Sequence, residues 1–416
     1  MDLRKNLISG FSVSLLALPL CLGIAVASHF PPIAGIITAI VGGLIASFLG
    51  SSPYTIKGPA AGMIVVVLAA VTELGYEKTL AVGVIAALLQ IAIAIFRQAS
   101  IAEKIPSSVI HGLLTAVGLI IVIKQAYVLM GVHHIKGSLP ELIVNLPYAF
   151  TQLNPLIFAM GCMALFLNLT WKNLSISRYI PATLLILVGV IAATYAFDLN
   201  KDFVYKFAGK IYTITRADYI DLPTHVLSAI TFPDFTEVLS LASLKHIIVF
   251  TLVGATESLL TVCAVNSIKS DEPASDLNKD LKSLGIANLV SSFIGGMPMI
   301  SEIVRTRANI DYGATSSLSN FIHGFLLLLV LILFPDVMDY TALTALAAIL
   351  IVVGFRLGSP REFMDHYQQG WGVFIPFMGT VITTVCKDLL SGVVLGLVLH
   401  GIIQFWRSRC KQTSSI

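Results

Sequence analysis

Helix-length apolar segments follow one another along almost the whole chain, and this pattern is the strongest constraint on its fold. Residues 7–28, 33–50, 79–96 and 106–131 are clear examples, and each approaches the roughly 20 residues that a helix needs to cross a bilayer. Only 12% of the residues are charged, whereas soluble domains contain about 25%. The segments show no strict alternation of apolar and polar residues, which argues against a membrane β-barrel. The sequence therefore predicts an all-α polytopic membrane protein.

About fourteen segments of this kind form two halves of seven, counting one span for roughly 20 residues. The first half takes residues 1–197, a polar connector takes 198–243, and the second half takes 244–416. An odd number of segments inverts the second half relative to the first, so we expect inverted repeats. The remaining segments are expected near residues 58–74, 155–171, 180–197, 245–268, 282–296, 300–311, 315–334, 341–355, 371–386 and 389–406, with an amphipathic helix near 139–150. Residues 1–28 resemble a signal peptide, but they lead directly into another apolar segment, so we expect an uncleaved first span.

Two apolar segments are interrupted at matching positions of the two halves. Residues 44–62 read LIASFLGSSPYTIKGPAAG, and residues 289–302 read LVSSFIGGMPMISE. Aligned without gaps, they share Leu44, Ser47, Phe48, Gly50 and Pro53 with Leu289, Ser292, Phe293, Gly295 and Pro298. Paired breaks of this kind are the best pointer in a sequence to the binding site of a transporter.

The first break leads into a helix start suited to an anion. Gly58 and Pro59 restart the apolar segment, and proline is well tolerated in the first helical turn because its missing N–H would be unpaired there. The small residues Ala60, Ala61 and Gly62 leave the backbone N–H groups of this turn accessible. We therefore expect these groups to contribute to a substrate site.

The second break supplies the opposite helix start. If that helix begins near Ser301, its first-turn N–H groups and dipole attract an anion. Glu302 and Arg305 lie three residues apart and share one helical face, so Arg305 either adds a positive charge for an oxyanion or pairs with Glu302.

Lys57 and Glu302 occupy equivalent positions in the two breaks. Lys57 either attracts the anion at the first helix start or neutralises Glu302 across the break, and the sequence does not distinguish these alternatives. Arg307 and Asp311 are expected at a solvated edge.

Glu257 is the ionisable residue that stands out within a span, in the stretch TLVGATESLLTV. A charged residue at the bilayer centre costs at least about 2.5–3.5 kcal/mol, so it is a functional candidate by default. Thr261 lies one helical turn further on. The carboxylate can bind Na⁺, carry a proton, hold a nearby cation in place, or serve as a structural anchor between helices.

Basic residues in the short loops predict the orientation in the membrane. With the N-terminus inside, the basic residues of one set of loops fall on the cytoplasmic side, namely Arg97, Lys104, Lys172, Arg178, Arg305, Arg307, Arg356, Arg361, Arg407, Arg409 and Lys411. Both termini are therefore expected in the cytoplasm. Scattered basic residues give no nucleic-acid surface, and the sequence shows no metal-binding spacing, nucleotide-binding loop or nucleophile–base set, so we expect neither an enzyme nor a bound cofactor.

These motifs resemble the sulfate permease (SulP) family of anion transporters across about residues 5–405. The resemblance rests on PPIAGIITAIVGGLIASFLGSS followed by KGPAAG, on ATESLLTV, and on GGMPMISEIVRTRANIDYGATSSLSN, the last being similar to the bicarbonate-transporter branch. The resemblance implies a fold shared with uracil permeases, in which a core domain moves against a gate domain. It also implies that the cytosolic regulatory STAS domain found in many members is missing here.

The resemblance further assigns roles to individual residues. The family's anion site maps to two stretches, Gly58-Pro59-Ala60-Ala61-Gly62 and Ile303-Val304-Arg305. Glu257 and Thr261 match positions that bind Na⁺ in Na⁺-coupled bicarbonate carriers. Lys57 and Glu302 replace residues that are usually uncharged, and a second acid facing Glu257 keeps proton coupling open.

The expected function is secondary active transport of a small inorganic anion, bicarbonate or sulfate, by alternating access, coupled to Na⁺ or H⁺ through Glu257 and Glu302. The alternatives are a proton-coupled nucleobase symporter and an uncoupled anion channel. The expected setting is the lipid bilayer of a bacterial inner membrane, and a homodimer is compatible with the sequence.

Overall fold

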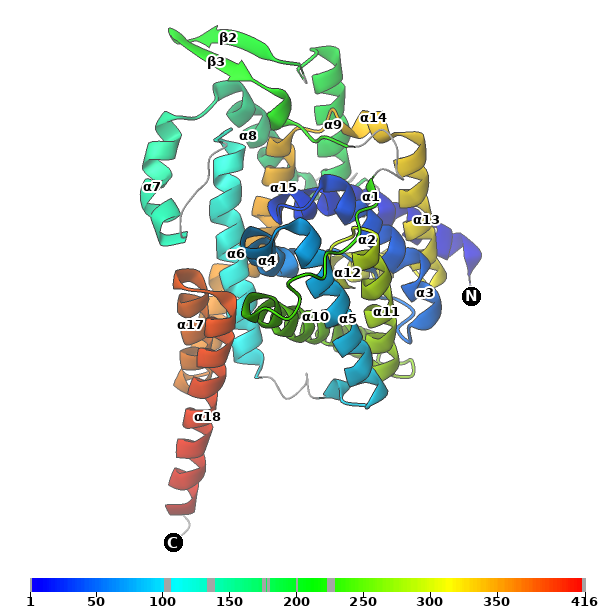
Figure 1. Ribbon diagram of the computed structural model, residues 1–416, viewed down its shortest axis with the longest axis vertical. Coiled ribbons are helices and arrows are strands. Elements are labelled where there is room, and N and C mark those ends of the chain that lie inside the picture. Colours follow the sequence, from blue (N-terminus) through cyan, green and yellow to red (C-terminus); the bar gives the residue numbers. More distant parts are fainter. Residues whose placement is uncertain are drawn as a thin grey trace.

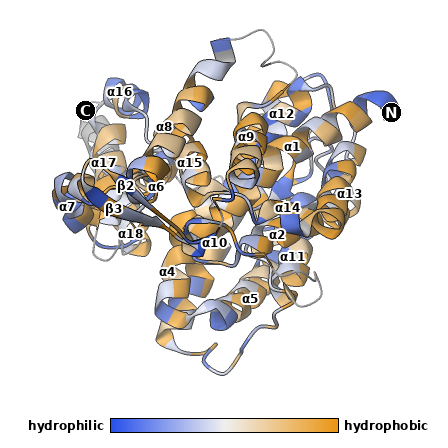
Figure 2. Ribbon diagram, turned by 90° about the horizontal axis from the view of Figure 1, so that it is seen from above, coloured by the Kyte–Doolittle hydropathy of each residue, from blue (hydrophilic) through white to orange (hydrophobic). Residues whose placement is uncertain are grey.

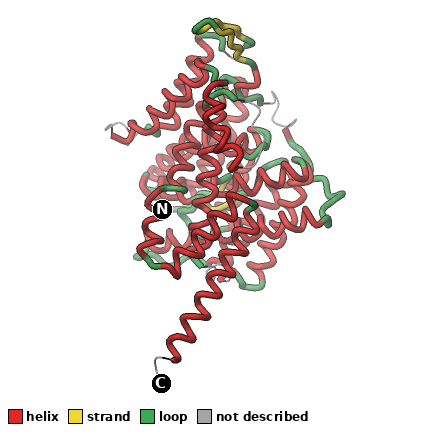
Figure 3. The backbone as a smooth tube through the Cα atoms, turned by 90° about the vertical axis from the view of Figure 1, so that its left-hand side faces the viewer, coloured by secondary structure: helices red, strands yellow, loops and turns green. Residues whose placement is uncertain are grey.

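The computed structural model describes residues 2–100, 106–132, 139–173, 177, 180–199, 201–222 and 229–413. It is built almost entirely of helices, with two short pairs of strands, one near the middle of the molecule and one at an end (Figures 1 and 3). Lys104 and Arg178, which entered the orientation argument, lie outside the described residues.

The first half follows the predicted segments closely. Its elements are α1 (Leu3–Ala27), α2 (Pro32–Leu44), α3 (Ala46–Leu49), β1 (Lys57–Gly58), the 3₁₀ turn η1 (Ala61–Met63), α4 (Ile64–Leu74), α5 (Tyr76–Ile95), α6 (Ser107–Leu129), α7 (Leu139–Thr151), α8 (Pro155–Thr170) and α9 (Ala182–Ala196). Local signals set several helix starts. Asp2 and Asn154 cap α1 and α8 with their side chains, and prolines begin α2 and α8, where a missing N–H costs nothing.

The second half has the same plan. Its elements are α10 (Leu241–Ile268), α11 (Leu277–Phe293), β4 (Ile300–Ser301), α12 (Ile303–Asp311), α13 (Leu318–Leu333), α14 (Pro335–Met338), α15 (Leu343–Leu357), α16 (Pro360–Gln368), α17 (Trp371–Cys386) and α18 (Leu389–Thr413). Helix α16 lies between the expected segments 341–355 and 371–386, in a stretch where no segment was expected. The connector between the halves contains a hairpin of β2 (Phe203–Phe207) and β3 (Lys210–Ile214), at the end of the molecule opposite the C-terminus (Figure 1).

Within the described residues, seven helices are long and apolar enough to cross a membrane, and α7 with α8 forms a bent pair that passes the same test. Four more apolar helices of 10–17 residues, including the η1–α4 segment Ala61–Leu74, are shorter than a full crossing. Apolar residues dominate the helices, as Figure 2 shows. Together with α11 and the short α12, these elements occupy the positions of the predicted fourteen segments; the boundaries of the two repeats stay a prediction.

The helices pack into two groups, each drawn from both halves of the chain. The core group contains α1–α5 and α10–α13, with close packing of α11 on α5 and of α13 on α2. The gate group contains α6–α9 and α15–α18, with α6 packed against α15 and α17. In Figure 1, α6, α7, α17 and α18 lie on the left and α2, α5, α11 and α13 on the right. Helices α1, α4 and η1 contact the gate group, so the two groups meet along an extended interface.

Candidate functional site

The two predicted breaks meet in the structure as an antiparallel pair of strands. Lys57 of β1 lies opposite Ser301 of β4, and Gly58 lies opposite Ile300. The N–H of Glu302 donates to the carbonyl of Ile56 at 2.9 Å, which extends the pairing. Backbone without helical hydrogen bonds is tolerated at membrane depth only where protein buries it, and each break here satisfies the other. The pairing places the starts of the η1–α4 segment and of α12 close together.

The start of α12 differs from the expectation in one respect. The helix begins at Ile303, and Glu302 is its N-cap. The Glu302 carboxylate accepts hydrogen bonds from the N–H groups of Val304 at 3.1 Å and Arg305 at 2.6 Å. Glu302 therefore occupies two N–H groups in the first turn of α12, where we expected an anion to bind. By contrast, Ala60 precedes η1 without any side-chain cap.

Arg305 lies behind this pair of breaks and connects them. Its side chain is fully buried, its Nη2 donates to the carbonyl of Pro59, and its Nη1 lies 3.5 Å from Sγ of Cys21. Its Nε lies 3.4 Å from the Glu302 carboxylate, so the internal pair considered from the sequence is present. A Cβ at Gly58 would lie 2.9 Å from Nη1 of Arg305, so only glycine allows this approach.

Lys57 makes contacts that were not expected from the sequence. Its Nζ forms a buried ion pair with Asp280 of α11 at 3.0 Å and lies 3.0 Å from the Thr55 hydroxyl. Both charged side chains are at most 2% exposed. The pairing with Glu302 is therefore wrong for this structure. The lysine instead holds the first break against α11.

A cavity of about 300 Å³ opens in front of the two breaks, between the core and gate groups. Its core side is lined by Ala60, Ala61, Gly62, Glu257, Thr261, Glu302, Ile303 and Val304, and its gate side includes Ile110, His111, Leu114, Val353 and Leu357. We call it the central cavity. Five of the predicted site residues do not line this cavity but lie behind its wall, namely Lys57, Gly58, Pro59, Ser301 and Arg305.

Glu257 brings its carboxylate to the start of the η1–α4 segment. A Cβ placed on Gly62 would lie 2.7 Å from the carboxyl carbon of Glu257, so the carboxylate sits directly against that first turn. Among the described residues, Oε1 of Glu257 and the hydroxyls of Thr256 and Ser301 are buried without a hydrogen-bond partner. Buried oxygens of this kind are normally satisfied, so they are candidates to receive a cation or a proton.

The contact between Gly62 and Glu257 gives a direct test. Gly62→Ala is expected to reduce anion uptake by at least about tenfold, or about 1.4 kcal/mol, because the new methyl group displaces the carboxylate. The free energy of unfolding should change by less than about 1 kcal/mol, since alanine favours a helix and a flexible side-chain end can move. Uptake in proteoliposomes and thermal unfolding measure the two effects.

Gly189→Ala is the matched control, because a Cβ there meets no atom within 4 Å. The shorter acid in Gly62→Ala/Glu257→Asp should recover part of the lost uptake. Wild-type uptake by the Gly62→Ala variant would contradict a role for this contact.

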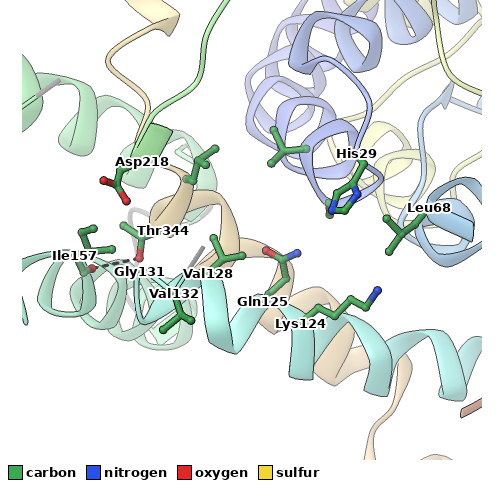
Figure 4. Close-up of a pocket in the computed structure, with 13 residues that line it drawn as sticks. His29, Leu68, Lys124, Gln125, Val128, Gly131, Val132, Ile157, Asp218 and Thr344 are labelled. Carbon is green, nitrogen blue, oxygen red and sulfur yellow. Dashed lines mark hydrogen bonds between the residues drawn. The ribbon is translucent and has the colours of Figure 1, made fainter. Parts of the chain in front are cut away.

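A second cavity of about 260 Å³ lies on the same core–gate interface, toward the other ends of α6 and α15. Figure 4 shows His29 and Leu68 on one side and Lys124, Gln125 and Val128 of α6 on the other. Burial, and then the charge of Lys124, lower the pKa of His29, so its imidazole is neutral near pH 7. We call this the outer cavity; Lys124 is its basic group.

Sequence reasoning missed two of these charged residues. Lys124 lies inside the predicted span 106–131 and carried the same signal as Glu257, an ionisable residue within an apolar segment. Asp280 lies just before the expected segment 282–296, and no local pattern links it to Lys57, which is 223 residues away.

Comparison with known proteins shows that the chain is similar to named transporters. The "Putative sulfate transporter YvdB" of Bacillus subtilis (strain 168) is 27% identical over 95% of this chain and 72% of its own length. The "Bicarbonate transporter BicA" of a Picosynechococcus species is 25% identical over 100% of this chain and 72% of its own length. These relatives are named as transporters, which agrees with the expectation that the chain is not an enzyme.

Solved structures share the fold. The transmembrane domain of a cyanobacterium bicarbonate transporter BicA superimposes with a TM-score of 0.79 at 24% identity, covering 94% of this chain and 98% of that one. SLC26A9 gives a TM-score of 0.81 at 15% identity, covering 97% of this chain and 65% of that one. The likeness confirms the predicted seven-plus-seven inverted-repeat fold. Residues 3–375 match the family described as the sulfate permease family. The chain therefore belongs to the sulfate permease family.

Proposed function

We propose that the chain is a secondary active transporter of a small inorganic anion, bicarbonate or sulfate, and that it binds the anion in the central cavity. The observation that carries the proposal is the uncapped helix start at Ala61, which lies beside the Glu302-capped start of α12 on the wall of one cavity between two helix groups. The start of the η1–α4 segment offers N–H groups to an anion, and the positive dipole ends of both helices point toward the cavity. The bicarbonate and sulfate transporters among its relatives support this substrate class.

The charges around the central cavity favour a coupling cation. Glu257 and Glu302 line it, and Arg305 lies behind it, so two carboxylates and one guanidinium leave one net negative charge. An anion placed about 5 Å from a carboxylate costs roughly 3 kcal/mol at an effective dielectric constant near 20. A proton or Na⁺ on Glu257 removes this cost. Thr261, one turn along α10 and on the same cavity wall, adds a hydroxyl ligand for Na⁺.

The two cavities support an alternating-access mechanism. Helices α6 and α15 line both of them, through Ile110 and Val353 at the central cavity and through Lys124 and Thr344 at the outer cavity. A movement of the core group along these helices would connect the anion site with one cavity at a time. The basic loop residues predict that the central cavity faces the cytoplasm. In this orientation, the outer cavity faces the opposite side of the membrane, and Lys124 provides a positive charge there.

Flux measurements in proteoliposomes test the proposal. Uptake of labelled bicarbonate, sulfate and uracil is compared under imposed Na⁺ and H⁺ gradients. Saturable uptake of bicarbonate or sulfate driven by one of the gradients supports the proposal. Uptake of uracil alone would favour a nucleobase symporter, and an anion conductance independent of both gradients would favour a channel.

Glu257→Gln separates coupling from anion binding. The amide keeps the shape of the side chain but cannot take up a proton or balance a Na⁺ charge. Uptake driven by the cation gradient should fall to the background of empty liposomes, while exchange of internal for external anion persists. Gradient-driven uptake at the wild-type rate would show that Glu257 does not couple the cation.

A further inference from the structure

We propose that His111, Glu362 and His366 form a binding site for a borderline-soft divalent cation of the Zn²⁺ class at the rim of the central cavity. His111 lies near the N-terminal end of α6, and the other two residues lie one turn apart on α16. One ligand atom from each of the three lies within 4.8 Å of the others. The sequence showed no metal-binding pattern because His111 and Glu362 are 251 residues apart.

The geometry of these side chains suits a zinc ion. Nδ1 of His111 lies 3.1 Å from Oε2 of Glu362, and one ligand atom of each of the three residues lies within 4.8 Å of the other two. Zinc bonds to nitrogen and oxygen are about 2.0–2.2 Å long, so ligand atoms around a tetrahedral ion lie about 3.3 Å apart. Small rotations of the His111 and Glu362 side chains toward the His366 ring therefore bring the three groups to bonding distance.

The surroundings of His366 hold its ring in place. The imidazole is buried and stacks on Phe377, with ring centroids 4.3 Å apart and planes inclined by 11°. Its Nδ1 lies 2.7 Å from the backbone oxygen of Glu362. Histidine metal ligands commonly use one ring nitrogen for such a bond, which fixes the tautomer and leaves the other for the metal.

Two imidazoles and one carboxylate select for Zn²⁺ and similar ions over Mg²⁺ and Ca²⁺, which prefer oxygen ligands. A simple ion pair explains the contact between His111 and Glu362, but it does not require the second histidine. His111 also lines the central cavity. A bound ion would therefore lie at the edge of that cavity, with a coordination position open to water or to an anion.

Calorimetric titration of the purified full chain with ZnCl₂ tests the site. We expect one saturable equivalent per chain, with Mg²⁺ unable to compete. The variants His111→Ala, Glu362→Gln and His366→Gln should each weaken Zn²⁺ binding by at least about tenfold. Co²⁺ in place of Zn²⁺ should give visible absorption bands that these variants lose.

His400→Ala is the matched control, because it removes a histidine that is not one of the three proposed ligands and should leave the affinity unchanged. His111 is exposed, so its removal does not disturb buried packing, and the unfolding midpoint without metal verifies the fold. The proposal is overturned if no saturable equivalent is found, or if all three ligand variants bind Zn²⁺ like the wild type. The Zn²⁺ titrations of the wild type and of the variants do not depend on transport. Their outcome therefore can be distinguished from a failure of the proposed function.

Discussion

Arg305→Ala is expected to reduce anion uptake by at least about 100-fold. The guanidinium is the positive side chain that touches both breaks, through the Pro59 carbonyl and the Glu302 carboxylate. Its loss removes the donor to the buried Pro59 carbonyl and the charge that offsets Glu302, whose carboxylate keeps its two backbone N–H donors. Hydrogen bonds to charged groups contribute about 1.5–3 kcal/mol each, and 2.8 kcal/mol is roughly a factor of 100. Initial uptake rates over a range of anion concentrations measure the effect.

Arg307→Ala provides the matched control on the same helix. Arg307 pairs with Asp311 at 3.1 Å, and both side chains are 56% exposed, so its removal should leave uptake within about twofold and stability within about 1 kcal/mol. Arg305→Lys keeps the charge but loses the planar fork, and we expect intermediate uptake. If Arg305→Ala is folded and transports with wild-type kinetics, the residue has no part in anion recognition.

Much of the helical architecture was predictable because long apolar segments have few alternatives in a membrane. The expected span 106–131 became α6 (Ser107–Leu129), and the span 371–386 became α17 (Trp371–Cys386). Helix α16 was not predicted from the sequence because Arg361, Glu362 and Asp365 make this stretch polar. It is an amphipathic helix rather than a span, and its nine residues contain no continuous apolar segment.

The site was predictable as far as the internal repeat extends. The repeat indicated that residues 44–62 and 289–302 meet, and the strands β1 and β4 confirm the contact. The partners of individual charges were not predictable, because they depend on packing between distant segments. Glu302 caps its own helix, α12, and Lys57 forms an ion pair with Asp280 on a third element, α11. A one-dimensional alignment of two breaks contains no information about that third element.

Lys57→Met is expected to lower the free energy of unfolding by about 3–5 kcal/mol. It leaves the Asp280 carboxylate buried without its partner, and breaking a buried ion pair from one side is strongly destabilising. The unfolding midpoint in detergent measures the loss. Lys78→Met is the control, because the Lys78–Glu237 pair is partly exposed, at 28% and 56%, and should contribute no more than about 1 kcal/mol.

The double variant Lys57→Met/Asp280→Leu separates the structural role of Lys57 from a role toward the anion. With both charges gone, no carboxylate is left uncompensated, so the stability should return to within about 1 kcal/mol of the wild type. Because Lys57 lies behind the cavity wall and is committed to Asp280, this variant should also transport with an unchanged KM. A stable double variant whose KM rises tenfold would show instead that the lysine attracts the anion through the wall. A double variant as unstable as Lys57→Met alone would show that the ion pair is not the source of the stability.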